Sequence, residues 1–160
     1  MNSKLYIKNF KGKGVRFKKW IGSFLLYLHA NSVILDVGSG LGYNADYMEK
    51  KGFKVIRSDV DKEFMKFQKK PVIYFDILKP HKRKFDAIIM CLVLSMFSPL
   101  QIPKILENIS MSMKDDGIFT FNVPIEWSRK DIISLVTNAE LKIRKITHDE
   151  SWWFLICSKA

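Results

Sequence analysis

The stretch Val33-Ile-Leu-Asp-Val-Gly-Ser-Gly-Leu-Gly42 decides how this chain folds. A short apolar run precedes three glycines at alternating positions, which is typical of a buried strand that enters a tight turn. Glycines directly after a parallel strand let the backbone approach a ligand closely, at the carboxyl edge of the sheet where open α/β folds bind. The stretch therefore predicts a ligand-binding turn in an α/β fold.

The turn differs from two common glycine-rich nucleotide-binding patterns. A phosphate-binding loop of the form Gly-x-x-x-x-Gly-Lys-Ser/Thr does not occur in the sequence. A dinucleotide-binding turn has a small residue at its sixth position for helix packing, and Tyr43 stands there instead. Asp36, two residues before the first glycine, favours a ligand that carries positive charge near the turn. A plain tight turn is the alternative interpretation.

Outward from the turn, apolar strand-like runs alternate with helical patterns. This alternation predicts a parallel sheet covered by helices on both faces. The expected strands are residues 33–37, 53–58, 72–75, 85–91 and 117–123, and the expected helices are residues 17–30, 43–51, 61–70 and 100–114.

The C-terminal part departs from this rhythm. Ser128, followed three residues later by Asp131, is typical of a helix N-terminus, and the helix should extend to about residue 139. Residues 141–147 and 152–158 alternate as two strands of a hairpin. We therefore predict a single-domain, doubly wound α/β fold, with a mostly parallel seven-stranded sheet, helices on both faces and a C-terminal antiparallel hairpin.

Length and composition fit one folded domain. The chain has 160 residues, of which 48% are hydrophobic and 27% charged, and this mixture excludes a disordered chain. No run of 18 apolar residues occurs, so no membrane association is expected. Cys91 and Cys157 lie in apolar runs and cannot form a disulfide framework, and the start of the chain lacks the apolar stretch of a signal peptide. We expect an intracellular location, cytoplasmic or nuclear.

The positive charge is concentrated at the start of the chain. The net charge is +11, and seven Lys and Arg residues fall within residues 1–20, which contain no Asp or Glu. We treat residues 1–16 as a basic N-terminal arm before a domain of residues 17–160. A basic segment interleaved with aromatic residues is what a phosphate backbone attracts. Biased codon usage, which gives a chain rich in Lys and Ile, is the alternative explanation.

Three successive strands are expected to end near an Asp. Asp36 precedes the glycines, and Asp59 closes the second strand about 20 residues after them, where an acid typically binds ribose hydroxyls. Asp76 and Ile77 close the third strand, where a side chain could meet the edge of an adenine. Helix capping or loop solvation is the alternative for each acid, and we assign Asp61 to capping the next helix.

This set of motifs resembles the class I S-adenosylmethionine (SAM)-dependent methyltransferases over residues 31–160. The resemblance rests on the family's hhhDhGxGxG pattern at 34–42, on the acids described above, on Lys114-Asp-Asp-Gly117, which is similar to the family's Lys-Pro-Gly-Gly turn, and on the C-terminal hairpin. It implies SAM as the cofactor. The implied cofactor-binding residues are Asp36, Gly38, Ser39, Gly40, Gly42, Asp59, Val60, Asp76, Ile77 and Cys91.

The resemblance also implies the kind of chemistry. The methyl group of SAM is already activated, so the protein must mainly exclude water and hold a nucleophile in line. No obligatory acid–base pair is therefore expected. Two cysteines and three scattered histidines form no recognisable metal-binding pattern, so we expect no metal.

In this family the acceptor pocket lies beyond strands four and five, here residues 91–97 and 122–127. The acceptor-side candidates are Ser95, Asn122 and Trp127, and the catalytic residues are otherwise unassigned. The Asn-Pro-Pro-Tyr motif of amino-methylating members is missing after strand four. Cys91 lacks the Pro-Cys setting of the cytosine-C5 enzymes, which favours a buried core thiol.

The sequence leaves the acceptor open between classes. Residues 36–44 and 102–108 are similar to tellurite-resistance and related small-molecule methyltransferases, whereas residues 85–94 are faintly similar to ribosomal-RNA adenine methyltransferases. From the basic arm and the basic loop at 79–84 we predict RNA as the acceptor. A small-molecule acceptor and a non-catalytic subunit that binds SAM or RNA are the alternatives, and a protein partner could supply substrate recognition.

Overall fold

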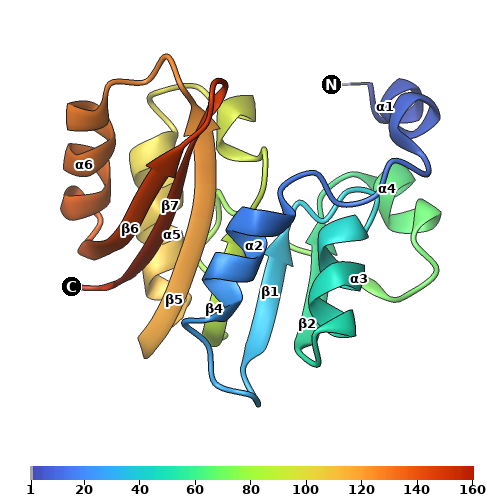
Figure 1. Ribbon diagram of the computed structural model, residues 1–160, viewed down its shortest axis with the longest axis horizontal. Helices are drawn as coiled ribbons and strands as arrows, with labels where there is room; N and C mark the ends of the chain where they lie inside the picture. The colour runs from blue at the N-terminus through green and yellow to red at the C-terminus, as the bar shows by residue number, and fades with distance from the viewer. Residues whose placement is uncertain (1) are drawn as a thin grey trace. The chain divides into compact units, whose positions relative to one another are not determined.

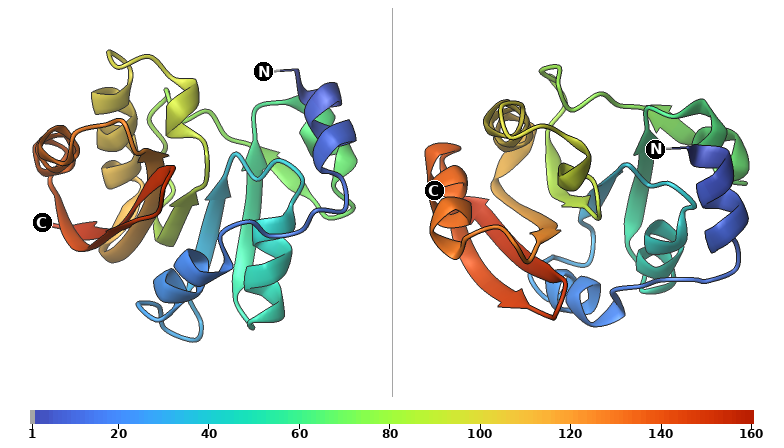
Figure 2. Two further views of the ribbon diagram at one scale, coloured as in Figure 1. Left: turned by 45° about the horizontal axis from the view of Figure 1, so that its top comes forward. Right: turned by 90° about the horizontal axis from the view of Figure 1, so that it is seen from above.

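The computed structural model describes residues 2–160 (Figures 1 and 2). Its seven strands form a mostly parallel sheet in the order β3-β2-β1-β4-β5-β7-β6, which confirms the predicted fold class. The chain divides after Asp76 into two compact units, and each is described separately.

The first unit contains the three parallel strands β1 (Val33–Val37), β2 (Lys54–Asp59) and β3 (Val72–Tyr74). Val33 lies opposite Lys54, and Arg57 lies opposite Val72. Four of the five β1 residues are buried, which suits a strand covered on both faces. These strands match the predicted ones within a residue or so, because their apolar runs are short and clearly bounded.

Four helices belong to the first unit: α1 (Ser3–Phe10), α2 (Lys18–Leu25), α3 (Tyr43–Lys50) and α4 (Lys62–Phe67). Asp61 Oδ1 caps α4 by accepting a hydrogen bond from Glu63 N at 2.8 Å, as predicted for this residue. Helix α2 is shorter than the predicted 17–30, since the chain leaves it at Leu26, which is 86% exposed. Helix α4 also ends early, because Gln68 is extended.

The second unit begins with β4 (Phe85–Met90), which pairs in parallel with β5 (Met113–Pro124). The short 3₁₀ helix η1 (Leu94–Met96) and helix α5 (Ile102–Met111) connect them, and α6 (Arg129–Asn138) follows β5. Strand β5 starts earlier than the predicted residue 117, because Met113 already pairs with Phe85 across a register shift. Ser128 Oγ caps α6 by accepting a hydrogen bond from Asp131 N at 3.1 Å, as predicted.

The predicted C-terminal hairpin is present. Strand β6 (Leu141–His148) pairs antiparallel with β7 (Trp152–Lys159), and β7 inserts between β5 and β6, antiparallel to both. The buried residues of α5 and α6 pack over the apolar face of β5 that carries Phe119 and Phe121, whose rings stack at 4.8 Å. Within residues 2–160, the helices are too short or too polar for any of them to cross a bilayer.

Candidate functional site

The turn between β1 and α3 has a left-handed backbone at all three of its glycines. The φ angles of Gly38, Gly40 and Gly42 are 65°, 53° and 81°, a region that other residues rarely adopt. Ser39 N donates to Ser58 O at 2.8 Å, and Gly42 N donates to Ser39 O at 2.8 Å. The turn is thus tied to the end of β2 as well as to itself.

The glycines of this turn have different surroundings. A Cβ atom built on Gly40 would meet only Gly38 O, at 3.8 Å, so this part of the turn is open to a ligand. A Cβ atom on Gly42 would lie 2.6 Å from Gln68 Oε1 and 2.7 Å from Arg57 Nη1. A side chain at Gly42 would therefore displace the ends of two side chains that pack beneath the turn.

The carboxylate of Asp59 lies at the end of β2 beside this turn. It accepts hydrogen bonds from Gly40 N at 3.0 Å, from Val60 N at 2.8 Å and from Asp61 N at 3.0 Å. A carboxylate offers about four acceptor positions, so this one still has capacity for another donor. Asp59 is buried, whereas Val60 is 53% exposed.

Asp36 is the most unusual acid in the first unit. It is only 1% exposed, and its Oδ2 is buried without a hydrogen-bond partner among residues 2–160. Burial raises the pKa of Asp36 to about 7; the nearby charge of Asp59 adds to the rise, and that of Arg57 opposes it. A buried carboxylate without a partner is costly unless a cation meets it. The residues present therefore fit a ligand with a positively charged group.

A second cluster lies beneath the turn and was not predicted from the sequence. Arg57 is buried, and its Nη2 contacts Asp46 Oδ1 at 2.6 Å and Glu49 Oε2 at 2.7 Å. Burial alone would lower the pKa of Arg57, but the hydrogen bonds and charges of these two acids outweigh it, and the net pKa is raised. Its Nη1 donates to Gln68 Oε1 at 3.0 Å. A lone Arg within an apolar strand, with acids three residues apart in the preceding helix, is the sequence signal that could have identified this cluster.

The other predicted cofactor residues are divided between the two units. Asp76 is half-buried after β3, and the preceding residue, Phe75, donates its N–H to Asp59 O at 3.3 Å. Ile77 is buried at the start of the second unit, where its carbonyl accepts a hydrogen bond from Asn108 Nδ2 at 2.8 Å. Cys91 is half-buried just after β4, also in the second unit.

Among the acceptor-side candidates, Asn122 has the most specific contact. It is fully buried, and its Oδ1 accepts a hydrogen bond from Leu92 N at 2.7 Å. Leu92 has a φ of 61°, which is rare for a residue other than glycine. The Asn122 side chain thus holds the turn after β4, and its Nδ2 has no hydrogen-bond partner within the described part of the chain.

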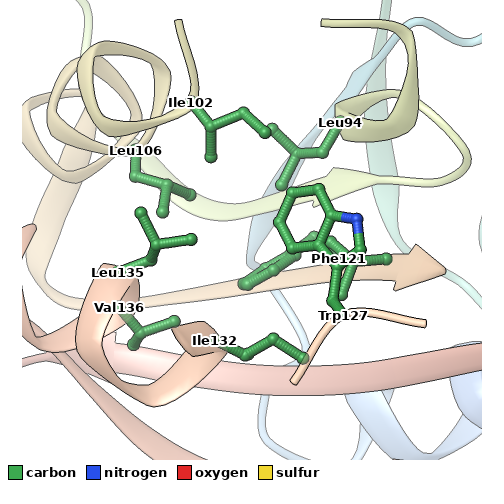
Figure 3. Close-up of a pocket in the computed structure, with 9 residues that line it drawn as sticks. Leu94, Ile102, Leu106, Phe121, Trp127, Ile132, Leu135 and Val136 are labelled. Atoms are coloured by element: carbon green, nitrogen blue, oxygen red, sulfur yellow. The ribbon is translucent and has the colours of Figure 1, made fainter. Parts of the chain in front are cut away.

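Trp127 and Ser95 lie in different surroundings. The half-buried Trp127 ring lines a small apolar cavity with residues of η1, α5, α6 and β5, including Leu94 and Phe121 (Figure 3). This cavity offers about 10 Å³ to the centre of a water molecule, which is room for one water at most and not for an acceptor. Ser95 is exposed on η1. Within residues 2–160, no group of three or more His, Cys, Asp or Glu side chains is placed to hold a metal ion.

The basic arm is docked next to the glycine turn. Its helix α1 packs against α4, as Figures 1 and 2 show, and the Tyr6 ring meets the Phe64 ring edge-on at 5.7 Å. The Tyr43 hydroxyl, one residue after the turn, accepts a hydrogen bond from Gly12 N and donates one to Phe10 O at 3.3 Å. All seven Lys and Arg side chains of residues 1–20 remain exposed.

Comparisons with known proteins identify the family of this chain. A family described as "Methyltransferase domain" matches residues 13–154. A TehB-like SAM-dependent methyltransferase from Corynebacterium glutamicum has a similar structure, with a TM-score of 0.83 and 17% identity over 99% of this chain and 98% of that one. The 1,6-didemethyltoxoflavin-N1-methyltransferase of Burkholderia thailandensis, solved with S-adenosylhomocysteine (SAH), has a TM-score of 0.77 and 15% identity over 89% of this chain and 77% of that one.

A curated relative extends the comparison to sequence. The ribosomal protein L11 methyltransferase of Staphylococcus haemolyticus is 23% identical over 146 residues, which are 84% of this chain and 45% of that protein. The chain thus spans about half the length of this relative. The family match covers most of the chain, including the turn, Asp36 and Asp59. The chain therefore belongs to the methyltransferase domain family, and its fold is the Rossmann-like fold of class I methyltransferases.

Proposed function

We propose that the protein transfers the methyl group of SAM to RNA. When bound, SAM would supply a methyl group carried on a cationic sulfur. Transfer of this methyl group to a nucleophile would leave SAH as the second product. In this proposal Asp36 pairs with the ammonium of the amino-acid end, and the backbone of residues 38–40 accommodates that end closely. Asp59 accepts from the ribose hydroxyls, and Val60, Asp76 and Ile77 contact the adenine. Gly42 supports the turn from beneath.

The Oδ2 atom of Asp36, which has no hydrogen-bond partner within residues 2–160, is the observation that carries the cofactor assignment. A folded protein pays a free-energy penalty to keep such an atom buried, and a bound cation removes the penalty. A dinucleotide, whose pyrophosphate is anionic, would increase the penalty. Titration calorimetry with SAH tests this assignment, and absence of binding at millimolar ligand would contradict it.

The docked arm supports an RNA acceptor. Seven exposed cations within residues 1–20 are carried by a segment that Tyr43 and Phe64 hold at the cofactor turn. Phosphate groups of a nucleic acid would bind there, while a base is presented to the methyl group. The basic loop of residues 79–84 belongs to the second unit.

Filter binding of total RNA across a salt series tests the acceptor. Lys11, Lys13, Arg16, Lys18 and Lys19 are changed together to Gln; a control of equal net charge changes the exposed Lys50, Lys51, Lys54, Lys130 and Lys142. Because each phosphate contact contributes about 0.7 to the salt slope for single strands, we expect the loss of five cations to reduce the slope of the arm variant by up to about 3.5. The control should keep most of the slope. Equal behaviour of the two variants would contradict the proposal.

A small-molecule acceptor is the second candidate, and the position of α1 favours it. A helix held at the cofactor turn by Tyr43 could also cover the site and exclude water. The Burkholderia neighbour is named for a small-molecule substrate. Transfer of labelled methyl groups into cell extract separates the candidates: label lost with RNase supports RNA, and label in the small-molecule filtrate supports the second candidate. Label lost with protease would indicate a protein acceptor.

A further inference from the structure

We propose that Gln68 is a positioning residue for SAM. Its side chain holds the glycine turn in the conformation that binds SAM, and Arg57 orients that side chain. This inference rests on the proposed role of that turn in cofactor binding. Gln68 is the residue at which α4 ends, and its extended backbone turns the side chain away from the helix. It has no place in the glycine motif and would not contact the reacting atoms.

The side chain of Gln68 reaches the turn with both of its N–H groups. Its Nε2 donates to Ser39 Oγ at 2.8 Å and to Gly40 O at 2.9 Å. Gly40 N donates in the opposite direction, to Asp59 Oδ2 at 3.0 Å. The middle residue of the turn is therefore held on both sides, by the end of β2 and by the end of α4.

Arg57 fixes which way the Gln68 amide faces. An amide side chain can be rotated so that its oxygen and nitrogen exchange places. Arg57 Nη1 donates to Gln68 Oε1 at 3.0 Å, so the oxygen must face Arg57 and both N–H groups must face the turn. Arg57 is itself held by Asp46 and Glu49 of α3. The orientation of the amide thus depends on a buried ion-pair cluster.

This arrangement organises the turn before SAM binds. A binding loop that is already held in its bound conformation loses less conformational freedom on binding, and its affinity is correspondingly higher. A Cβ atom on Gly42 would lie 2.6 Å from Gln68 Oε1 and 2.7 Å from Arg57 Nη1, so these two side chains lie directly against the turn. Without Gln68, Ser39 Oγ and Gly40 O lose the donors that define their positions.

Titration calorimetry with SAH on two variants tests the inference. Gln68→Glu keeps an oxygen beside Arg57 but removes both donors to the turn, and Gln68→Met removes every polar contact. Because small displacements of a binding group cause large losses, we expect the Kd for SAH to rise about tenfold or more in both variants. Gln101→Met is the matched control; Gln101 also lies at a helix end, accepts hydrogen bonds from Ser98, and belongs to the second unit. Its Kd should stay within about twofold of wild type.

Three outcomes are distinguishable. Failure of the wild type to bind SAH contradicts the proposed function itself. Wild-type binding with unchanged Kd values in folded Gln68→Glu and Gln68→Met overturns only the positioning role. Hydrogen exchange in the ligand-free wild type is a second test that needs no variant. We expect the amides of Ser39, Gly40 and Gly42 to be protected from exchange before SAH is added. Free exchange of these amides would overturn the inference.

Discussion

Asp36 shows how one residue can link ligand binding to stability. Its side chain is fully enclosed, its Oδ2 has no partner within residues 2–160, and its pKa is raised to about 7 by burial. Because the folded state holds this proton more tightly than the unfolded state does, stability is complete below about pH 4 and is lost as the pH rises through 7. Ionised Asp36 is thus a cost to the ligand-free protein that a cationic ligand would offset.

Asp36→Asn should stabilise the ligand-free protein at high pH. Asn has nearly the same shape but no charge, so the variant avoids the penalty, which is at most about 4 kcal/mol at pH 8. Urea unfolding at pH 5 and at pH 8 measures the effect, and the advantage of the variant should be much larger at pH 8. An advantage that is independent of pH would show that Asp36 is ionised and solvated in the folded protein.

Binding of SAH should depend on pH in the opposite sense. If the ionised carboxylate pairs with the ligand's ammonium, binding releases a proton below pH 7, and affinity should rise by up to about tenfold per pH unit between pH 5.5 and 7. Asp36→Asn should bind weakly at every pH without this rise. Calorimetry in two buffers of different ionisation enthalpy measures the proton release directly, and zero release at pH 6 would contradict the pairing.

Gly42→Ala should be more damaging than its backbone angle alone implies. Gly52 offers a matched control, because its φ of 92° is similar and a Cβ there would meet nothing within 4 Å. Gly52→Ala should cost about 1–2 kcal/mol in the free energy of unfolding, from backbone strain alone. Gly42→Ala adds a clash with Arg57 and Gln68, so we expect at least about 2 kcal/mol more. Equal costs in the two variants would show that these side chains move away without loss.

At the level of single residues, sequence reasoning identified the acids and glycines of the turn but not what supports them. Asp61 was correctly assigned to helix capping, because capping is a local interaction. Tyr43 was noted only as too large for a dinucleotide fingerprint; the structure shows that its hydroxyl holds the arm. The Gln68 contacts join residues 11 to 29 positions apart, and no local pattern predicts them.

At the level of elements, the strands were predicted well and the helix ends less well. Parallel strands have continuous apolar runs between turns, which makes them easy to locate. The end of α2 depends on whether Leu26 is buried or exposed. Leu26 follows other apolar residues, so the sequence alone does not show that it is exposed. Helix α1 was expected only as a basic arm, since its contacts with Phe64 and Tyr43 are made by distant parts of the chain.

Tyr43→Phe should loosen the arm without unfolding the protein. The change removes the hydroxyl that bonds to Gly12 N and Phe10 O but keeps the ring. Loss of this contact should cost about 1 kcal/mol of docking free energy, so the arm opens about fivefold more often. Limited trypsin digestion at the arm lysines measures the opening, with Tyr47→Phe on the same helix as control. A digestion rate equal to that of the control would contradict the anchoring role of Tyr43.

At the level of the whole molecule, the arm and the cofactor turn share their supports. Tyr43 begins α3 directly after the turn, and α4 carries both Phe64, which contacts the arm, and Gln68, which contacts the turn. RNA on the arm and SAH in the turn should therefore stabilise the same docked arrangement. Binding linkage is reciprocal, so each ligand must change the affinity of the other by the same factor.

We expect this factor to be about fivefold for a single-stranded oligoribonucleotide and SAH, near the lower end of typical coupling. Fluorescence anisotropy of the labelled RNA with and without saturating SAH gives one side of the cycle, and calorimetry of SAH with and without RNA gives the other. Tyr43→Phe should reduce both factors together, because it releases the arm without changing its charge. Tight RNA binding with a factor of one would show that arm and turn act independently, and a factor that persists in Tyr43→Phe would show that their coupling does not depend on Tyr43.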